Sequence, residues 1–278
     1  MLKTALRTVV HLGIIAVLTL FTQIGGLAYA VAWAIRFWLF KPHRRSMAVL
    51  VGLFVVFYGI FWFAATRVAP LAGRVPIACL AASNVEPVGQ SLLYCALNRN
   101  YVVPELARLL TDLAAHMDRK FPGTETLVLD AGFPFFDGFP LLPHLSHKDG
   151  RKVDLAFYYH DIDGRYVPGA TKSPIGYWAF EEAPDDNVPP CPRSPGWKTL
   201  RWDMRWFRVF NSDLQLDKDR TREALRWLTT TGRKAGLSKI LLEPHLKRTL
   251  RATGDIVRFQ GCRAARHDDH IHIEIGTR

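Results

Sequence analysis

Two long apolar runs dominate the first quarter of the chain. Leu12 to Ile35 is a run of 24 residues in which Gln23 is the only strongly polar side chain, and Met47 to Thr66 is a second run of 20 residues. A helix needs about 20 apolar residues to cross a hydrocarbon core of about 30 Å. We therefore predict a helical hairpin that binds the lipid bilayer through two membrane-spanning helices.

Basic residues around these runs predict their orientation. The intervening segment RFWLFKPHRRS contains Arg36, Lys41, Arg44 and Arg45. Short loops rich in Lys and Arg stay on the cytoplasmic side, so both chain ends are predicted to face outward. The fragment LAYA at residues 27–30 has the small residues of a signal-peptidase site, but the apolar run continues past it, which favours an uncleaved anchor.

Beyond the membrane anchor, predicted over residues 1–75, shorter helical and strand patterns alternate over residues 76–278. The apolar positions of Val103–Lys120 recur at helical spacing, and a second helix is predicted over Asp219–Lys234. TETLVLDAG, SKILLEP and HIHIEIG have strand patterns, and KVDLAFYYHDIDGRYVPG predicts a strand, an Asp-Gly turn and a returning strand. The predicted fold class is α+β, with a small antiparallel sheet flanked by helices.

The net charge of +11 comes mostly from the apolar quarter. Residues 1–75 hold eight Lys or Arg and no Asp or Glu, which leaves 28 basic and 25 acidic residues in the remainder. The charge excess therefore reflects membrane topology, and we predict no nucleic-acid partner.

All four cysteines follow the second apolar run. An even number of cysteines in an oxidising compartment predicts disulfides, and their proximity in sequence favours the pairs Cys79–Cys95 and Cys191–Cys262. Four buried thiols would be the alternative in a cytoplasmic domain.

Two clusters of metal-ligating side chains stand out. PHLSHKDGRKVDL contains His144, His147 and Asp154, and RHDDHIHIEIG near the C-terminus contains His267, His270 and His272, which completes the six residues of the two clusters. A catalytic zinc site takes three protein ligands and keeps one position open. On a strand, the last two histidines share one face about 7 Å apart, so that one imidazole could bind the ion while the other acts on a bound molecule.

The spacing of these six residues resembles that of the penicillin-insensitive murein endopeptidases, within the wider group of zinc D,D-peptidases and Hedgehog-like domains. The resemblance covers roughly residues 120–278. It implies that Zn²⁺ is bound by His147, Asp154 and His272. It also implies that His270 is the catalytic acid/base and that His144 and His267 line the catalytic site.

Three neighbouring residues qualify this assignment. Asp269 is the alternative general base, although strand alternation points it away from the face of His272. Glu274 is predicted either to orient an imidazole or to be a solvated edge residue. Lys152 stands where the relatives have a small residue.

The resemblance implies a membrane-anchored zinc metallopeptidase that hydrolyses amide bonds in peptidoglycan peptides, as an endopeptidase or a D,D-carboxypeptidase. Its catalytic domain would face the periplasm from the bacterial inner membrane. The alternative is a non-catalytic zinc-binding domain with a binding or structural role at the cell envelope, in which a fourth protein ligand would close the site.

The remaining histidines and a group of tryptophans fit no such site. We predict structural roles for the histidines His11, His43, His116, His160 and His245. The tryptophans are predicted to pack in the core rather than line a groove, and they are Trp197, Trp202 and Trp206.

Overall fold

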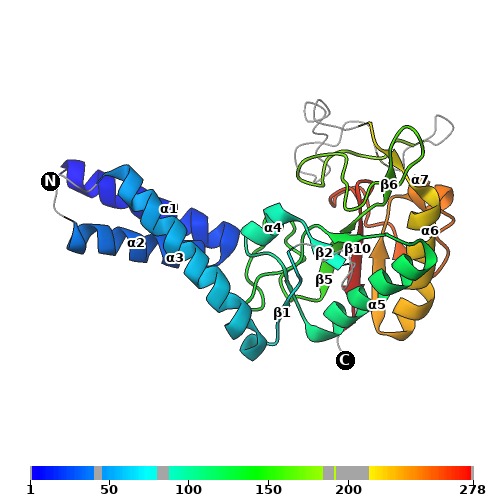
Figure 1. The fold of residues 1–278 in the computed structure, drawn as a ribbon, viewed down its shortest axis with the longest axis horizontal. Coiled ribbons are helices and arrows are strands. Elements are labelled where there is room, and N and C mark those ends of the chain that lie inside the picture. Colours follow the sequence, from blue (N-terminus) through cyan, green and yellow to red (C-terminus); the bar gives the residue numbers. More distant parts are fainter. Residues whose placement is uncertain (1, 41–45, 80–87, 184–190, 192–212, 277–278) are drawn as a thin grey trace.

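The computed structural model describes residues 2–40, 46–79, 88–183, 191 and 213–276. The chain forms a bundle of apolar helices followed by a globular part of mixed α and β structure (Figure 1). The bundle consists of α1 (Leu2–Thr22), α2 (Gly25–Leu39) and α3 (Met47–Val68). His43 and the three tryptophans predicted as core residues lie outside the described residues.

The first apolar run is not one continuous helix, so the prediction of a single span over Leu12–Ile35 is wrong. The chain reverses between α1 and α2, where Gln23 adopts a φ of 65°. A side chain on Gly26 would collide with the side chain of Thr19 and the carbonyl of Ile15. Glycine at this position therefore lets α2 pack closely against α1, and the run folds into a tight helical hairpin.

This reversal also changes the predicted topology. Within the described residues, two helical segments are long and apolar enough to cross a membrane, Ala5–Thr22 and Met47–Ala72, whereas α2 has only 15 residues. The start of α1, the end of α2 and the start of α3 lie at the end of the bundle remote from the globular part (Figure 1). Because the bundle contains three helices instead of two, the start of α1 lies remote from the globular part that carries the C-terminal strand, in contrast to the predicted arrangement with both chain ends together (Figure 1).

The globular part is built on a mixed six-stranded sheet with the strand order β2-β4-β5-β10-β8-β9. Its strands are β2 (Val88–Gln90), β4 (Thr126–Val128), β5 (Lys152–Ala156), β10 (His270–Ile275), β8 (Leu237–Leu241) and β9 (Val257–Arg258). The central pairs are antiparallel, but β2 is parallel to β4 and β8 is parallel to β9. The prediction of an antiparallel sheet is thus wrong at both edges, where helical crossovers return the chain in the same direction.

Helices supply those crossovers and cover one face of the sheet. Short helical segments are η2 (Ala69–Ala72), α4 (Leu92–Ala96) and α7 (Pro244–Thr249), and the longer ones are α5 (Pro104–Lys120) and α6 (Lys218–Trp227). The α5 helix and its predicted apolar stripe are confirmed, because the residues of the stripe are buried, namely Leu106, Leu109, Leu110, Leu113, Ala114 and Met117. The α6 helix begins beside its capping residue Asp217 and continues into a π-helical turn, η4 (Leu228–Gly232).

Two further pairs of short strands lie outside the main sheet. They are β1 (Val75–Pro76) with β3 (Tyr101–Val102), and β6 (Tyr159–His160) with β7 (Gln215–Leu216). The predicted Asp-Gly turn forms, since Asp161 accepts hydrogen bonds from the backbone of Asp163 and Arg165. The predicted returning strand is wrong, because a single bridge from His160 to Tyr166 is all that remains of it and β6 pairs with β7 instead.

Both predicted disulfides are confirmed. Cys79 pairs with Cys95, which ties the segment after β1 to α4, and Cys191 pairs with Cys262 in the loop before β10. Disulfides are typical of an oxidising compartment.

Candidate metal centre

The central strands of the sheet carry two of the three predicted metal ligands. In the antiparallel pair of β5 and β10, Asp154 lies directly opposite His272. Side chains alternate along a strand, so Ile271 and Ile273 enter the core under the helices while His272 shares the opposite face with Asp154. His147 comes from the loop between β4 and β5, and all three side chains are buried.

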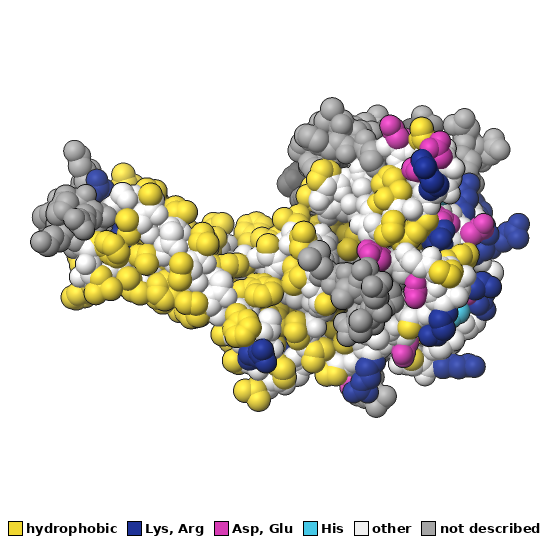
Figure 2. Space-filling view, viewed as in Figure 1, with side chains coloured by type: hydrophobic (Ala, Val, Ile, Leu, Met, Phe, Trp, Pro, Cys, Tyr) yellow, Lys and Arg dark blue, Asp and Glu magenta, His cyan; other side chains and the backbone are white. Residues whose placement is uncertain are grey.

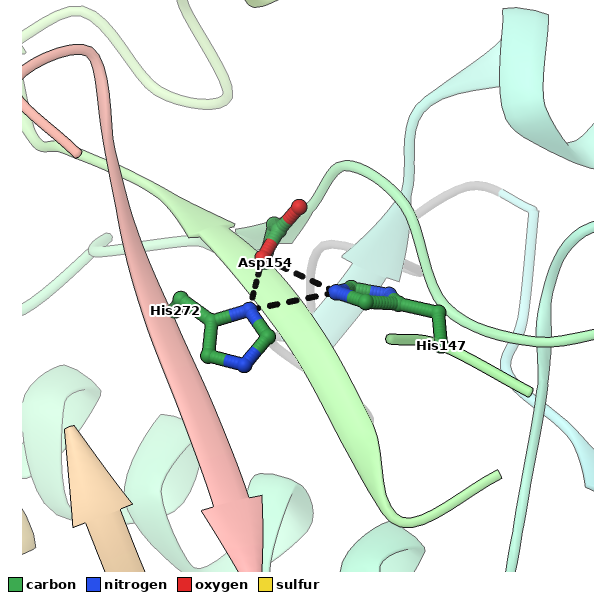
Figure 3. Close-up of side chains that lie close together, drawn as sticks. All are labelled: His147, Asp154 and His272. Carbon is green, nitrogen blue, oxygen red and sulfur yellow. Dashed lines mark hydrogen bonds and ion pairs between the residues drawn. The ribbon is translucent and has the colours of Figure 1, made fainter. Parts of the chain in front are cut away.

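These three side chains converge on one point (Figure 3). His147 Nε2 lies 3.1 Å from His272 Nδ1 and 3.3 Å from Asp154 Oδ1. His272 Nδ1 lies 2.8 Å from the same carboxylate oxygen. This His₂Asp group could therefore hold a metal ion.

Neighbouring groups fix how the ligand atoms point. His147 Nδ1 donates a hydrogen bond of 3.0 Å to the carbonyl of Ala131, which leaves Nε2 facing the group. Tyr177 donates a hydrogen bond of 2.7 Å to Asp154 Oδ2, which leaves Oδ1 facing the two imidazoles. Contacts of this kind orient metal ligands in proteins.

His270 lies beside the group without belonging to it. Its Nε2 is 3.6 Å from Asp154 Oδ1, while its Nδ1 is hydrogen-bonded to Asp269. Burial alone would lower the pKa of His270, but the carboxylates of Asp154 and Asp269 raise it to about 9. The second oxygen of Asp269 accepts a hydrogen bond from the backbone of Trp178, so Asp269 orients His270 and does not face the His₂Asp group.

His144 and His267 lie next to the group, with their rings 5.4 Å from that of His147 and 5.6 Å from that of His272. His144 Nδ1 lies 2.7 Å from Asp130 Oδ2, and Asp130 also forms a buried ion pair with Arg99. The ring of His267 lies 5.1 Å from that of His270, and burial together with the neighbouring imidazoles lowers its pKa well below the ordinary value. Neither residue belongs to the group of three, and the described part of the chain supplies no fourth ligand atom.

The electrostatics of the three residues are set by burial and by one another. Burial would raise the pKa of the Asp154 carboxyl, but the surrounding histidines lower it well below its usual value. Burial would lower the pKa of His147, yet Asp154 and Asp130 raise it. Burial dominates at His272 and lowers its pKa to about 4.

Sequence reasoning missed Tyr177, Asp130 and Arg99. The Tyr177 ring lies 4.8 Å from that of His144 and 5.0 Å from that of His270, although it comes from an irregular segment with no readable pattern. Asp130 lies two residues after the end of the buried strand β4, and that position was a signal that it could face a site.

Of the two alternatives predicted for Glu274, the structure does not show the first, an orienting contact with an imidazole. Its carboxylate lies 2.7 Å from Lys239 Nζ and 3.7 Å from Lys152 Nζ. Across the β5–β10 pair Glu274 lies opposite Lys152, so the register places the two charges together. Lys152 also contacts Asp149, which makes this an ion-pair cluster beside the candidate metal centre.

Four of the histidines predicted to be structural are described, and all lie outside the His₂Asp group. Each forms a hydrogen bond elsewhere in the structure. The partners are the side chains of Tyr29 for His11 and Glu223 for His116, and the carbonyls of Asp161 for His160 and Glu181 for His245.

Fold and site together define a mixed α/β protein with apolar N-terminal helices and a buried His₂Asp group that could hold a metal ion. No protein family matches this chain, and no curated protein is significantly similar to it.

Proposed function

We propose that this protein is a zinc metallopeptidase that hydrolyses amide bonds in the peptides of bacterial peptidoglycan. The observation that carries the proposal is the convergence of His147, Asp154 and His272, with His270 beside them. The spacing of the two histidine clusters, which resembles that of murein endopeptidases, supplies the substrate class.

The donor set and its geometry support zinc as the ion. Two imidazole nitrogens and one carboxylate oxygen are ligands that zinc accepts. With zinc–nitrogen bonds of about 2.0–2.1 Å, neighbouring atoms of a tetrahedral shell lie about 3.3 Å apart. The three ligand atoms are separated by 2.8, 3.1 and 3.3 Å, so the site needs little rearrangement to hold the ion.

Bound zinc would activate water and polarise the scissile carbonyl, while the surrounding side chains manage protons and orientation. His270, whose Nε2 faces the group, is placed to pass a proton to the leaving amine, and Asp269 holds the His270 ring in place. Burial lowers the pKa of His267, which favours its neutral form, and its ring lies 5.1 Å from that of His270. His144, held by Asp130, completes the wall of the site.

The proposed location is the outer face of the bacterial inner membrane. Apolar helices of membrane-spanning length support an anchor, and two disulfides support an oxidising compartment on the side of the globular part. Arg7 and Arg36 lie at the end of the bundle remote from the globular part, which supports a cytoplasmic position for that end.

A non-catalytic zinc-binding domain is the second candidate, and the burial of the ligands favours it. His147, Asp154 and His272 are only 1–4% exposed, as in a structural site. The absence of a fourth ligand from the described residues favours the hydrolase.

The test uses full-length protein in detergent, supplied with zinc and incubated with isolated peptidoglycan. We expect peptide fragments from the wild type and from His160→Ala, a control remote from the site. We expect none from His147→Ala, which should lack zinc, or from His270→Ala, which should retain it. Metal analysis and mass spectrometry of the products provide the readouts.

Two results would contradict the hydrolase. If the wild type binds one zinc ion and releases no fragment, the second candidate is correct. If the folded wild type binds no zinc, both candidates fail.

A further inference from the structure

Large apolar side chains are exposed where the globular part meets the bundle. Leu71 of η2, Leu92 and Leu93 of α4, and Phe136 in the loop after β4 are 89%, 61%, 39% and 74% exposed. We refer to these four residues as the apolar collar. Exposed apolar patches of this kind are typical of protein or membrane contact sites.

Hydrogen bonds between the globular part and the bundle place the collar next to the bundle. Leu71 belongs to the turn that directly continues α3. The last turn of α4 accepts hydrogen bonds from α3, of 2.6 Å from the Tyr58 hydroxyl to the carbonyl of Ala96 and of 2.9 Å from the Trp62 indole to that of Cys95. Leu92 and Leu93, in the same short helix, are therefore held close to α3.

The turn between α1 and α2 contacts the segment that contains Phe136, the fourth residue of the apolar collar. The side chain of Gln23 accepts a hydrogen bond of 2.9 Å from the backbone N–H of Phe135 and donates one of 3.1 Å to its carbonyl. Phe136 is the next residue. Asn98, just beyond α4, donates a hydrogen bond to the carbonyl of Thr22, at the end of α1. At this junction the globular part is thus bonded to the second half of α3, to the end of α1 and to the turn that leads into α2.

The dimensions of the bundle place the collar at a bilayer surface. The 21 residues of α1 rise about 31 Å, close to the hydrocarbon thickness of about 30 Å. When α1 spans that thickness, its end at Thr22 and the collar around it reach the boundary between acyl chains and headgroups. Hydrophobic side chains cover the bundle and continue onto the adjoining end of the globular part, whereas charged side chains gather at the opposite end (Figure 2).

We propose that the apolar collar inserts into the interfacial layer of the outer leaflet and seats the globular part directly on the membrane. Its occupant is lipid because the collar continues the apolar surface of α1 and α3, whose membrane-spanning windows are only 6% buried. Arg67 is exposed in the last turn of α3, with its guanidinium over the ring of Phe63, where it can meet headgroup phosphates.

The collar brings the metal centre close to the lipid surface. Phe136 and His147 line the same small cavity, together with Phe133 and Phe139. The loop that carries His147 therefore begins at the membrane contact. For the proposed function, on which this one consequence rests, the substrate would be peptide lying within reach of the bilayer surface.

Spin labelling tests the collar without reference to activity. All four native cysteines are paired, so a nitroxide attaches only to an introduced thiol. We would label Leu92→Cys, Leu93→Cys and Phe136→Cys, which lie outside the apolar segment Met47–Ala72, in full-length protein in nanodiscs of phosphatidylethanolamine and phosphatidylglycerol. Ile162→Cys is the matched control, because Ile162 is 72% exposed on the turn after β6.

Oxygen concentrates in lipid and a nickel chelate stays in water. We expect the ratio of oxygen to nickel accessibility to be severalfold higher at the three collar positions than at Ile162. Equal ratios at all four positions would overturn the proposal. Shielding of the collar labels from both reagents would also overturn it, since that result would indicate contact with protein, such as a second copy of the chain.

Discussion

At the scale of single residues, Asp154 lies at the centre of the candidate metal site. One carboxylate oxygen faces His147 and His272, and the other accepts the hydrogen bond of Tyr177. The orientation of this carboxylate therefore depends on a tyrosine that belongs to neither histidine cluster.

Replacing Tyr177 by Phe should weaken zinc binding. The variant keeps the ring between His144 and His270 and loses only the hydroxyl that holds Asp154. Loss of a hydrogen bond that orients a ligand lowers metal affinity by about 10- to 100-fold. Competition with a chromophoric chelator measures this change.

Tyr158→Phe is the matched control for that experiment. Tyr158 is equally buried, and its hydroxyl bonds Thr126 on the helical side of the sheet. Zinc affinity should be unchanged in this variant. A similar loss of affinity in both variants would mean that the hydroxyl of Tyr177 has no specific role.

At the scale of elements, the side chains of β10 alternate between the two faces of the sheet, so the strand contributes both to the core and to the candidate metal site. Ile271, Ile273 and Ile275 anchor β10 in the core. That packing fixes the positions of His270 and His272 on the opposite face of the sheet. The helices α5 and α6, which pack against the sheet, are linked to each other. Glu223 of α6 forms hydrogen bonds with His116 of α5 and with Arg226 of its own helix.

The Glu223 link should make stability depend on pH. The hydrogen bonds that Arg226 and His116 form with the carboxylate of Glu223 lower the pKa of Glu223 to about 2. A carboxyl with a lowered pKa stabilises the fold above its unfolded pKa of about 4.3, and this contribution is lost as the pH falls toward 2. Because Arg226 is largely exposed, water limits the contribution to about 1 kcal/mol.

Unfolding of the wild type and Glu223→Gln in urea provides the measurement. The difference between their free energies of unfolding should be largest at pH 7 and should shrink between pH 4.5 and pH 2. Comparison of the two proteins at each pH removes the effect of other carboxyls. A difference that does not change with pH would contradict the assignment.

At the scale of the whole molecule, the junction between bundle and globular part depends on Gln23. This polar residue interrupts an apolar run, and its amide bonds the backbone N–H and carbonyl of Phe135. The bundle is therefore joined to the loop that leads to His147.

Replacing Gln23 by Ala should loosen that loop. The backbone N–H and carbonyl of Phe135 are partly buried, so leaving each without its partner costs about 1 kcal/mol, the low end of the cost for a buried group. Amide hydrogen exchange of residues 133–139 should become faster, while exchange of β10 should not change. Thr66→Ala, which removes only a hydrogen bond to Phe63 within α3, should leave the loop as in the wild type. Unchanged exchange at 133–139 in Gln23→Ala would show that the amide does not hold the junction.

Much of this architecture could be read from local patterns. The stripe of α5, the strand β10 and the Cys79–Cys95 and Cys191–Cys262 pairs were predicted and are confirmed. Each is set by residue spacing within one segment, or by the small number of ways in which four cysteines can pair. The six residues of the two histidine clusters were likewise visible in the sequence, and the structure brings them into one neighbourhood.

Other features depended on contacts between distant segments. The break at Gln23 was hidden because hydropathy records how apolar a run is and not where its helix must turn back on itself. The parallel edge strands follow from helical crossovers, and Tyr177 reaches Asp154 from an irregular segment. No local pattern encodes these arrangements.

The sequence by itself determined which side chains could bind a metal ion, which segments are apolar enough for a bilayer, and which faces of α5 and β10 are buried. Tertiary structure alone decided that Asp154 lies opposite His272. It also decided that Tyr177 orients Asp154, that Asp269 orients His270, and that the turn between the apolar helices is hydrogen-bonded to the loop that carries His147. The physical reason is that periodicity and composition act within one segment, whereas strand register and side-chain packing are fixed only when remote segments meet.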